Sequence, residues 1–366
     1  MTLSSTSDTI LLAHGSGGLM MHELIESFFT LFDSEELRCG DDAAVLALRA
    51  QASACTEEKL TGLHGEAVPR IAFSTDTFVV TPHFFPGGDI GKLAVCGTVN
   101  DVATSGAVPR WLSVGFILEE GFSLASLKRI CASMAKAAAE ADVTIVTGDT
   151  KVVERGRGDG IYINTSGIGV FQDDTGTAYS RGGAQCKPGD KILLSGTLGD
   201  HGIAIISQRE GLSFATSIQS DTAPLNHLVQ AVIQAAPHTR CFRDPTRGGL
   251  ASTVNELAAQ SNTVFEIDED AVPVRDEVRG ACDMLGYDVF QVANEGKMVA
   301  IVPPEEAPAA LAAMRASRYG QDAAIIGEVL TLSEAADSVP RALVKTAYGS
   351  RRILDMLTGE QLPRIC

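Results

Sequence analysis

Aspartates recur beside glycine or another small residue at four places in the first half of the chain. The four places are Gly40-Asp41-Asp42, Ser74-Thr75-Asp76-Thr77, Asn100-Asp101 and Gly148-Asp149-Thr150-Lys151. Glycine lets the backbone approach a ligand closely, and its N–H groups can cradle phosphate. Carboxylates supply the oxygen ligands that Mg²⁺ prefers. Any one of these segments is typical of a turn or a helix cap, but four together predict a shared metal–nucleotide site.

Further polar segments could contact phosphate. Arg243–Gly249 places two arginines, an aspartate, a threonine and two glycines directly before an expected helix, which favours phosphate contact over a plain turn. His14–Gly18 fits an anion-binding loop and a flexible N-terminal loop equally well. Glu295 alone is typical of a solvated turn residue. Gly87–Leu93 resembles a Walker A loop but has the wrong spacing, so ATP would bind here without that loop.

The last residue of the chain is a cysteine. No two of the eight cysteines are spaced as a CxxC motif, and in a chain without a signal peptide we expect them to be reduced. Cys96 and Cys131 lie in apolar, helix-like segments that favour burial. Cys366 follows a polar stretch. A terminal cysteine is usually incidental, because exposure alone does not make a thiol reactive.

Charge and hydropathy exclude some classes of function. The net charge of −17 argues against a nucleic-acid partner, because phosphate backbones are bound by clustered Lys and Arg. No apolar run approaches the ~20 residues of a membrane helix. The N-terminus is polar and lacks the regions of a signal peptide, so we expect a cytoplasmic protein with no membrane partner.

The elements that must position these residues alternate between strands and helices. Hydrophobic periodicity predicts helices over 18–32, 90–105, 124–141, 201–209, 225–235, 249–260, 275–285 and 305–316. It predicts strands over 71–80, 111–118, 144–147, 161–171, 191–195, 263–267, 297–302 and 323–329. Such alternation in both halves indicates the α/β (α+β) class, with two α/β sandwich domains.

The same pass along the chain predicts its domains. We expect an N-terminal loop and helix (1–35), an ATP-binding and dimerisation domain (36–171), a C-terminal domain (185–332) and a tail (333–366). Residues 49–68 are expected to form a surface loop, and 172–190 to hold the domain boundary. Weak periodicity in the tail indicates that its last ten or so residues are mobile.

Read together, the motifs resemble the HypE family of carbamoyl dehydratases, which mature nickel–iron hydrogenases. The resembling segments are His14–Gly18, Gly40–Val45, Ser74–Pro109, Val146–Val153, Ser195–Gly202, Arg243–Gly249, Asn294–Lys297 and Pro363–Cys366. They cover nearly the whole chain in order, and the long run and the terminal PRIC are highly specific. The wider group is similar to aminoimidazole ribonucleotide synthetase, selenophosphate synthetase and thiamine-phosphate kinase.

The resemblance implies a homodimer whose ATP lies, with Mg²⁺, in a cleft between domains. It implies that HypF delivers a carbamoyl group to the thiol of Cys366, that ATP-dependent dehydration yields a thiocyanate, and that the HypC–HypD complex accepts the cyanide. Catalytic roles fall on Cys366, Lys151 and Glu295. The last two would exchange a proton if they lie close together, and otherwise Lys151 would neutralise phosphate charge. The implied ATP-binding residues are Asp41, Asp42, Asp76, Asn100, Asp101, Gly148, Asp149, Thr150 and Arg247. Those expected at Mg²⁺ are Asp41, Asp76, Asp101 and Asp149.

Two other functions remain open from the sequence. A kinase or synthetase of the same group would act on a diffusible substrate and would not need the last four residues. A scaffold would bind nucleotide only to present its tail to partners, without releasing phosphate. Neither function needs a thiol at the last position, so the terminal cysteine favours the dehydratase.

Overall fold

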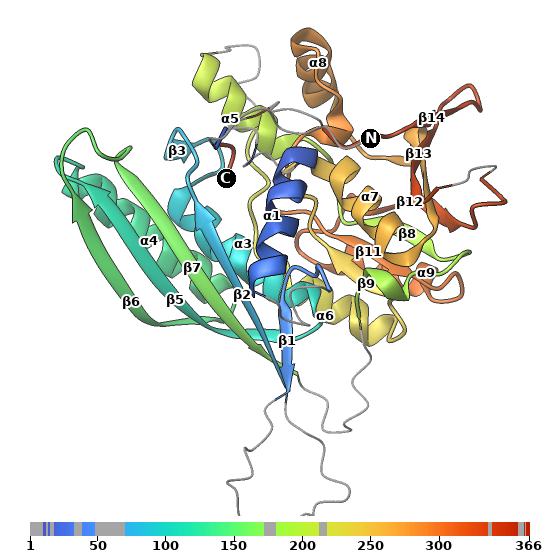
Figure 1. Ribbon diagram of the computed structural model, residues 1–366, viewed down its shortest axis with the longest axis horizontal. Helices are drawn as coiled ribbons and strands as arrows, with labels where there is room; N and C mark the ends of the chain where they lie inside the picture. The colour runs from blue at the N-terminus through green and yellow to red at the C-terminus, as the bar shows by residue number, and fades with distance from the viewer. Residues whose placement is uncertain are drawn as a thin grey trace, which may run out of the picture.

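Two sheets organise the protein in the computed structural model, which describes residues 10–11, 14, 18–32, 39–47, 70–171, 181–211, 218–335, 339–357, 362 and 364–366 (Figure 1). The helices are α1 (Leu19–Phe32), α3 (Ile90–Thr104), α4 (Leu124–Glu140), α5 (Asp200–Glu210), α6 (Asn226–Ala235), α7 (Gly249–Ser261), α8 (Asp276–Leu285) and α9 (Ala307–Ala316). The strands of the first half are β1 (Ala44–Ala47), β2 (Arg70–Phe78), β3 (Phe84–Phe85), β4 (Gly88–Asp89), β5 (Val108–Glu119), β6 (Thr144–Val153) and β7 (Ile161–Val170). Those of the second half are β8 (Lys191–Leu194), β9 (Cys241–Arg243), β10 (Val264–Asp268), β11 (Val299–Val302), β12 (Ala324–Leu330), β13 (Arg341–Lys345) and β14 (Arg351–Ile353).

The first half forms a five-stranded sheet with the order β1-β2-β7-β5-β6. Helix α3 is buried along almost its whole length because it packs on this sheet and also contacts α4 and α6. Asp89 caps its N-terminus, accepting hydrogen bonds from the backbone N–H groups of Gly91 and Lys92 at 2.8 and 3.0 Å. The opposite face of the sheet leaves large apolar side chains exposed, among them Trp111 and Ile117.

The second half forms a seven-stranded sheet with the order β14-β13-β10-β12-β8-β11-β9. One face packs a core with α7, and the other packs a core with α6 and α9. The two α/β layers predicted from the sequence are therefore present. The C-terminus lies near β3 and α5, between the two sheets (Figure 1).

The structure corrects the sequence-based elements in three places. Strand β6 continues to Val153, beyond the predicted end at 147. The predicted tail over 333–366 contains β13 and β14, which extend the second sheet. Its final residues, expected to be mobile, are docked against the body of the protein, as described below. The loop expected over 49–68 lies outside the described residues.

Candidate active site

The C-terminal residues lie against the chain that follows β2. The backbone N–H of Val79 donates to the carbonyl of Cys366 at 3.0 Å, and that of Thr81 donates to the carbonyl of Arg364 at 3.3 Å. Two backbone hydrogen bonds thus join the segments, although Arg364, with a φ of 50°, is not in an extended conformation. Backbone pairing of this kind fixes how far the terminal thiol reaches into the protein.

Side chains from distant elements secure the same segment. His201 on α5 bonds through Nε2 to the carbonyl of Ile365 at 2.8 Å, and Arg209 donates to the carbonyl of Arg364 at 2.9 Å. The guanidinium of Arg364 pairs with Asp159. The side chain of Ile365 is buried in a core that the first domain shares with α5 and α8 of the second. Backbone, ionic and apolar contacts thus all favour the docked tail.

Docking brings Cys366 beside acidic and basic side chains that are distant in sequence. Desolvation raises the pKa of its thiol to about 12, the charge of Arg247 opposes this shift, and the carboxylates of Glu295 and Asp76 reinforce it. The docked thiol is therefore held in its neutral form.

Arg247 is presented by a turn between β9 and α7. Gly248 and Gly249 follow it with φ angles of 77° and 61°, a left-handed conformation that glycine adopts without strain. A Cβ on Gly249 would also lie 2.6 Å from the carbonyl oxygen of Phe290. The turn depends on both glycines, and it directs the arginine into the cleft where its charge acts on Asp76 and Cys366.

Glu295 lies in a tightly held turn before β11. The buried amide of Asn294 accepts from Gly199 N–H at 2.8 Å and donates to the carbonyls of Pro245 and Val292, both at 3.0 Å. This one side chain ties the turn to α5 and to the segment that carries Arg247. Burial raises the pKa of Glu295 well above its ordinary value, and the carboxylates of Asp244, Asp76 and Asp221 raise it further.

Aspartates from three elements face one another beside this turn. Ser74 on β2 donates to the Oδ2 atom of Asp101 on α3 at 2.9 Å. Burial raises the pKa of Asp101, and the like charges of Asp76, Asp244 and Asp42 add to the effect. Among the described residues, no three His, Cys, Asp or Glu side chains already converge as a complete metal site. The mutual repulsion of these carboxylates nevertheless fits a divalent cation, which would relieve it.

Two other predicted nucleotide ligands of the first domain, Asp41 and Asp42, lie near Arg243, whereas Asn100 bonds to the backbone. Asp42 pairs with Arg243 at 3.1 Å, and one of its buried carboxylate oxygens has no hydrogen-bond partner. Burial raises the pKa of neighbouring Asp41. Asn100 instead has a structural contact, since its side chain donates to the carbonyl of Ala223 at 3.1 Å and accepts from the N–H of Leu225 at 2.8 Å.

Strand β6 places the remaining predicted residues outside the cleft. Lys151 pairs with Asp149 at 2.6 Å, and both side chains are about 70% exposed, at 71% and 70%. Gly148 and Thr150 are exposed beside them. Glu295 is buried, and Lys151 is not among the charges that act on it. The Lys151–Glu295 pair expected from the sequence is therefore not formed within one chain, because β6 is the outer edge of its sheet.

Sequence reasoning missed several residues of the cleft. Asp244 acts on Glu295, Asp101 and Cys366, and burial raises its pKa to about 6. Asp221 accepts the backbone N–H of Glu295 at 2.9 Å. His201 and Asp244 lie within motifs quoted above, but only the docked tail and the neighbouring carboxylates indicate their roles.

Comparison with known proteins shows the family to which this chain belongs. The model of the N-terminal domain of AIR synthase related protein matches residues 40–171, and that of its C-terminal domain matches residues 187–334. Carbamoyl dehydratase HypE of Azotobacter vinelandii is 48% identical over 365 residues, covering 100% of this chain and 99% of the relative. This chain belongs to the HypE family.

Solved HypE structures share the fold. The structure of a HypE–HypF complex has a TM-score of 0.79 and 45% identity, covering 91% of this chain and 99% of that chain. HypE in complex with ATP has a TM-score of 0.77 and 48% identity, covering 98% of this chain and 100% of that chain. Among the described residues, no helix is both long and apolar enough to span a membrane. The predicted AIR synthase fold and HypE family are confirmed.

Proposed function

We propose that the protein dehydrates a carbamoyl group carried on the thiol of Cys366, converting it to a cyano group at the expense of ATP. The observation that carries this proposal is the docked tail, which holds Cys366 beside Arg247 and Glu295. A kinase with a diffusible substrate would have this position blocked by its own chain. The relatives reported above are named for carbamoyl dehydration, so the kinase or synthetase alternative has less support.

The reaction balances as one carbamoyl thioester and one ATP giving a thiocyanate, ADP and phosphate. The carbamoyl oxygen attacks the γ-phosphorus, and the bond from that phosphorus to the bridging oxygen of ADP breaks. Glu295 accepts one proton from the nitrogen. Cleavage of the carbon–oxygen bond then forms the triple bond, and the departing phosphate takes the second proton. Glu295 suits this role because a raised pKa makes a carboxylate a stronger base.

Charge neutralisation around the triphosphate falls to residues beside Cys366. Arg247 would offset charge on the transferred phosphoryl group. We assign Mg²⁺ to Asp76 and Asp101, because both are buried and the charge of Asp76 acts on Asp101, and we keep Asp41 as a further candidate ligand. When bound, the metal supplies Lewis-acid stabilisation of the phosphates. The bonds that Asn100 makes argue for a positioning role in place of direct nucleotide contact.

We further propose a homodimer in which β6 meets a second copy. The strand is exposed along nearly all of its length and pairs on one side only, with β5. A long, partly apolar edge such as this favours aggregation unless another chain covers it. Val146 and Val152 on this strand are 57% and 68% exposed. In such a dimer, Asp149 and Lys151 would serve the nucleotide cleft of the partner copy.

The partners follow from the chemistry of the tail. The relative crystallised with HypF supports HypF as the donor of the carbamoyl group. A thiocyanate at the chain terminus also needs an iron-bearing acceptor, for which we propose the HypC–HypD complex. Both exchanges require the docked segment to leave the cleft, so the same contacts that promote dehydration must be broken for delivery.

Mass spectrometry of the intact chain tests the proposed function. Carbamoylated protein should lose the mass of one water on addition of ATP and Mg²⁺. Cys366→Ala should show neither modification nor water loss, while retaining its fold and ATP binding. Cys131→Ala, which removes an exposed thiol on α4, should behave as the wild type. Water loss from a modified Cys366→Ala chain would show that another residue carries the group.

A further inference from the structure

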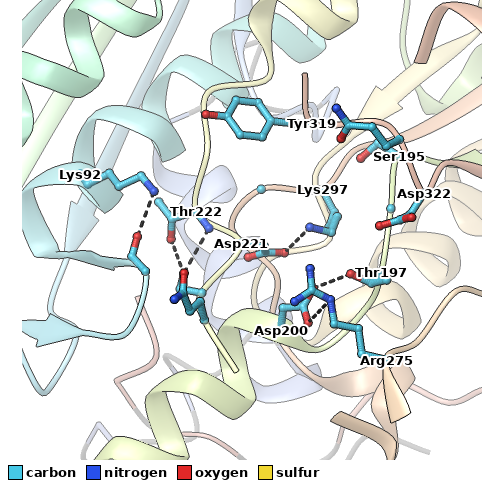
Figure 2. A pocket seen from close by; sticks show the side chains of 16 residues that line it. Lys92, Ser195, Thr197, Asp200, Asp221, Thr222, Arg275, Lys297, Tyr319 and Asp322 are labelled. Carbon is cyan, nitrogen blue, oxygen red and sulfur yellow. Dashed lines mark hydrogen bonds and ion pairs between the residues drawn. The ribbon is translucent and has the colours of Figure 1, made fainter. Parts of the chain in front are cut away.

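A second polar cavity lies between the two domains. The segment that carries Ser220 and Asp221 separates it from the docked tail. The volume of the cavity is about 330 Å³. Lys92 enters it from the first domain, whereas Ser195, Thr197 and Lys297 enter it from the second (Figure 2). Cys366 is not among its lining residues. The cavity is therefore a separate candidate site.

Several of the polar groups that line this cavity are buried, whereas others at its edge, such as Arg275 and Asp322, are exposed. Lys297 is 8% exposed, Thr222 is 1% exposed, and Ser195 is fully buried. Burying such groups around a void is costly unless water or a polar ligand satisfies them. The lining is thus that of a binding pocket for a polar molecule, unlike an apolar packing defect.

The cavity is lined by three cationic side chains, Lys92, Arg275 and Lys297, and by three carboxylates, Asp200, Asp221 and Asp322, and Lys92 is the cation that pairs with none of the described carboxylates. Lys297 pairs with Asp221 at 3.1 Å, which leaves donors on its ammonium group. Lys92 donates to the carbonyl of Gly87 at 3.0 Å, and no described carboxylate pairs with it. Arg275, towards the other side in Figure 2, is already paired with Asp200 at 3.5 Å. Two ammonium groups beside serine and threonine hydroxyls match a tetrahedral oxyanion.

We propose that this cavity binds a phosphate-class oxyanion, either inorganic phosphate or the phosphate group of a small phosphomonoester, through Lys92 and Lys297. The site goes beyond the proposed dehydration and does not depend on it. Inorganic phosphate is nevertheless a product of that reaction, so the site offers a place where product could act on the enzyme.

The wall of the cavity is shared with the tail-binding cleft. Ser220 lines the cavity, and its hydroxyl lies 2.8 Å from Nδ1 of His201, whose Nε2 holds the carbonyl of Ile365. Asp221, next in sequence, contacts both Lys297 and the backbone of Glu295. An oxyanion that binds to Lys297 or Ser220 therefore alters the contacts that position the tail. By linkage, tail docking alters oxyanion affinity to the same extent.

Calorimetric titration of the full chain without nucleotide tests the site at constant ionic strength. The probes are inorganic phosphate and ribose 5-phosphate. Lys92→Met should weaken the binding of at least one probe about tenfold or more, and Lys92→Arg should restore it. The control is Lys136→Met, which removes an exposed lysine on α4 that does not line the cavity.

The two probes identify the source of the oxyanion. Tighter Lys92-dependent binding of ribose 5-phosphate would support a phosphomonoester, and equal or tighter binding of inorganic phosphate would support the free ion. If neither probe binds, or if Lys92→Met binds both as tightly as Lys136→Met does, the proposal is wrong. Because no ATP or carbamoyl group is present, failure here leaves the proposed dehydration untouched.

Discussion

Arg209 offers a way to loosen the tail without touching the reacting groups. Its guanidinium donates to the carbonyl of Arg364 at 2.9 Å and to the carbonyl of Thr81 at 2.7 Å, joining the tail to the segment after β2. Arg209→Met keeps the apolar stem and removes these donors. A hydrogen bond to a charged group contributes about 1.5–3 kcal/mol. Losing the bond to Arg364 should therefore raise the undocked fraction of the tail roughly 10- to 150-fold.

Alkylation of Cys366 measures that fraction. In the docked state the thiol is partly buried and its pKa is about 12, so alkylation proceeds mainly through the undocked state. Iodoacetamide labelling, followed by mass spectrometry of the C-terminal peptide, should show a rate increase of the same size for Arg209→Met. The control is Arg318→Met, which removes a surface arginine paired with Glu140 at 2.8 Å. Equal labelling rates in both variants would refute the idea that Arg209 clasps the tail.

Two further predictions concern pH and stability. The pKa of Cys366 is about 12 when docked against ~8.5 for a free thiol, so docking is fully favoured below pH ~8.5 and weakens as pH rises towards 12. Carboxypeptidase should therefore digest the wild-type tail faster than the Cys366→Ala tail as pH increases from 8 to 10; a constant ratio would contradict this linkage. Asn294→Ala removes three buried hydrogen bonds and should lower the free energy of unfolding by about 2–4 kcal/mol, measured by urea denaturation. A loss below about 1 kcal/mol would mean that Asn294 does not hold the turn.

Periodicity predicted the main layers because the amphipathic strands and helices carry their signal locally. Strands β13 and β14 were missed since their patterns are short and depend on pairing with β10. The docking of the tail could not be read from sequence, because its anchors His201 and Arg209 lie more than a hundred residues away. The spacing of residues along the chain therefore did not indicate that His201 and Arg209 hold the tail.

The site residues also divide into those that local sequence indicates and those that depend on long-range contacts. Three of the four aspartate segments come together, since Asp42 and Asp76 act on Asp101, whereas Asp149 lies exposed on β6. Asp244 was overlooked because one aspartate in a turn looks like an ordinary cap. The family resemblance gave Lys151 and Glu295 catalytic roles without saying whether they are close, and the order of strands puts Lys151 on β6 at the edge of the sheet.

Transfer of oxygen to phosphate tests the central claim most directly. The carbamoyl group on Cys366 is prepared with a heavy oxygen isotope and a single turnover is started with ATP and Mg²⁺. If the carbamoyl oxygen attacks the γ-phosphorus, the released phosphate should carry the heavy oxygen in proportion to the cyano product. Unlabelled phosphate, accompanied by full conversion to the thiocyanate, would contradict phosphorylation of a tail-bound carbamoyl group.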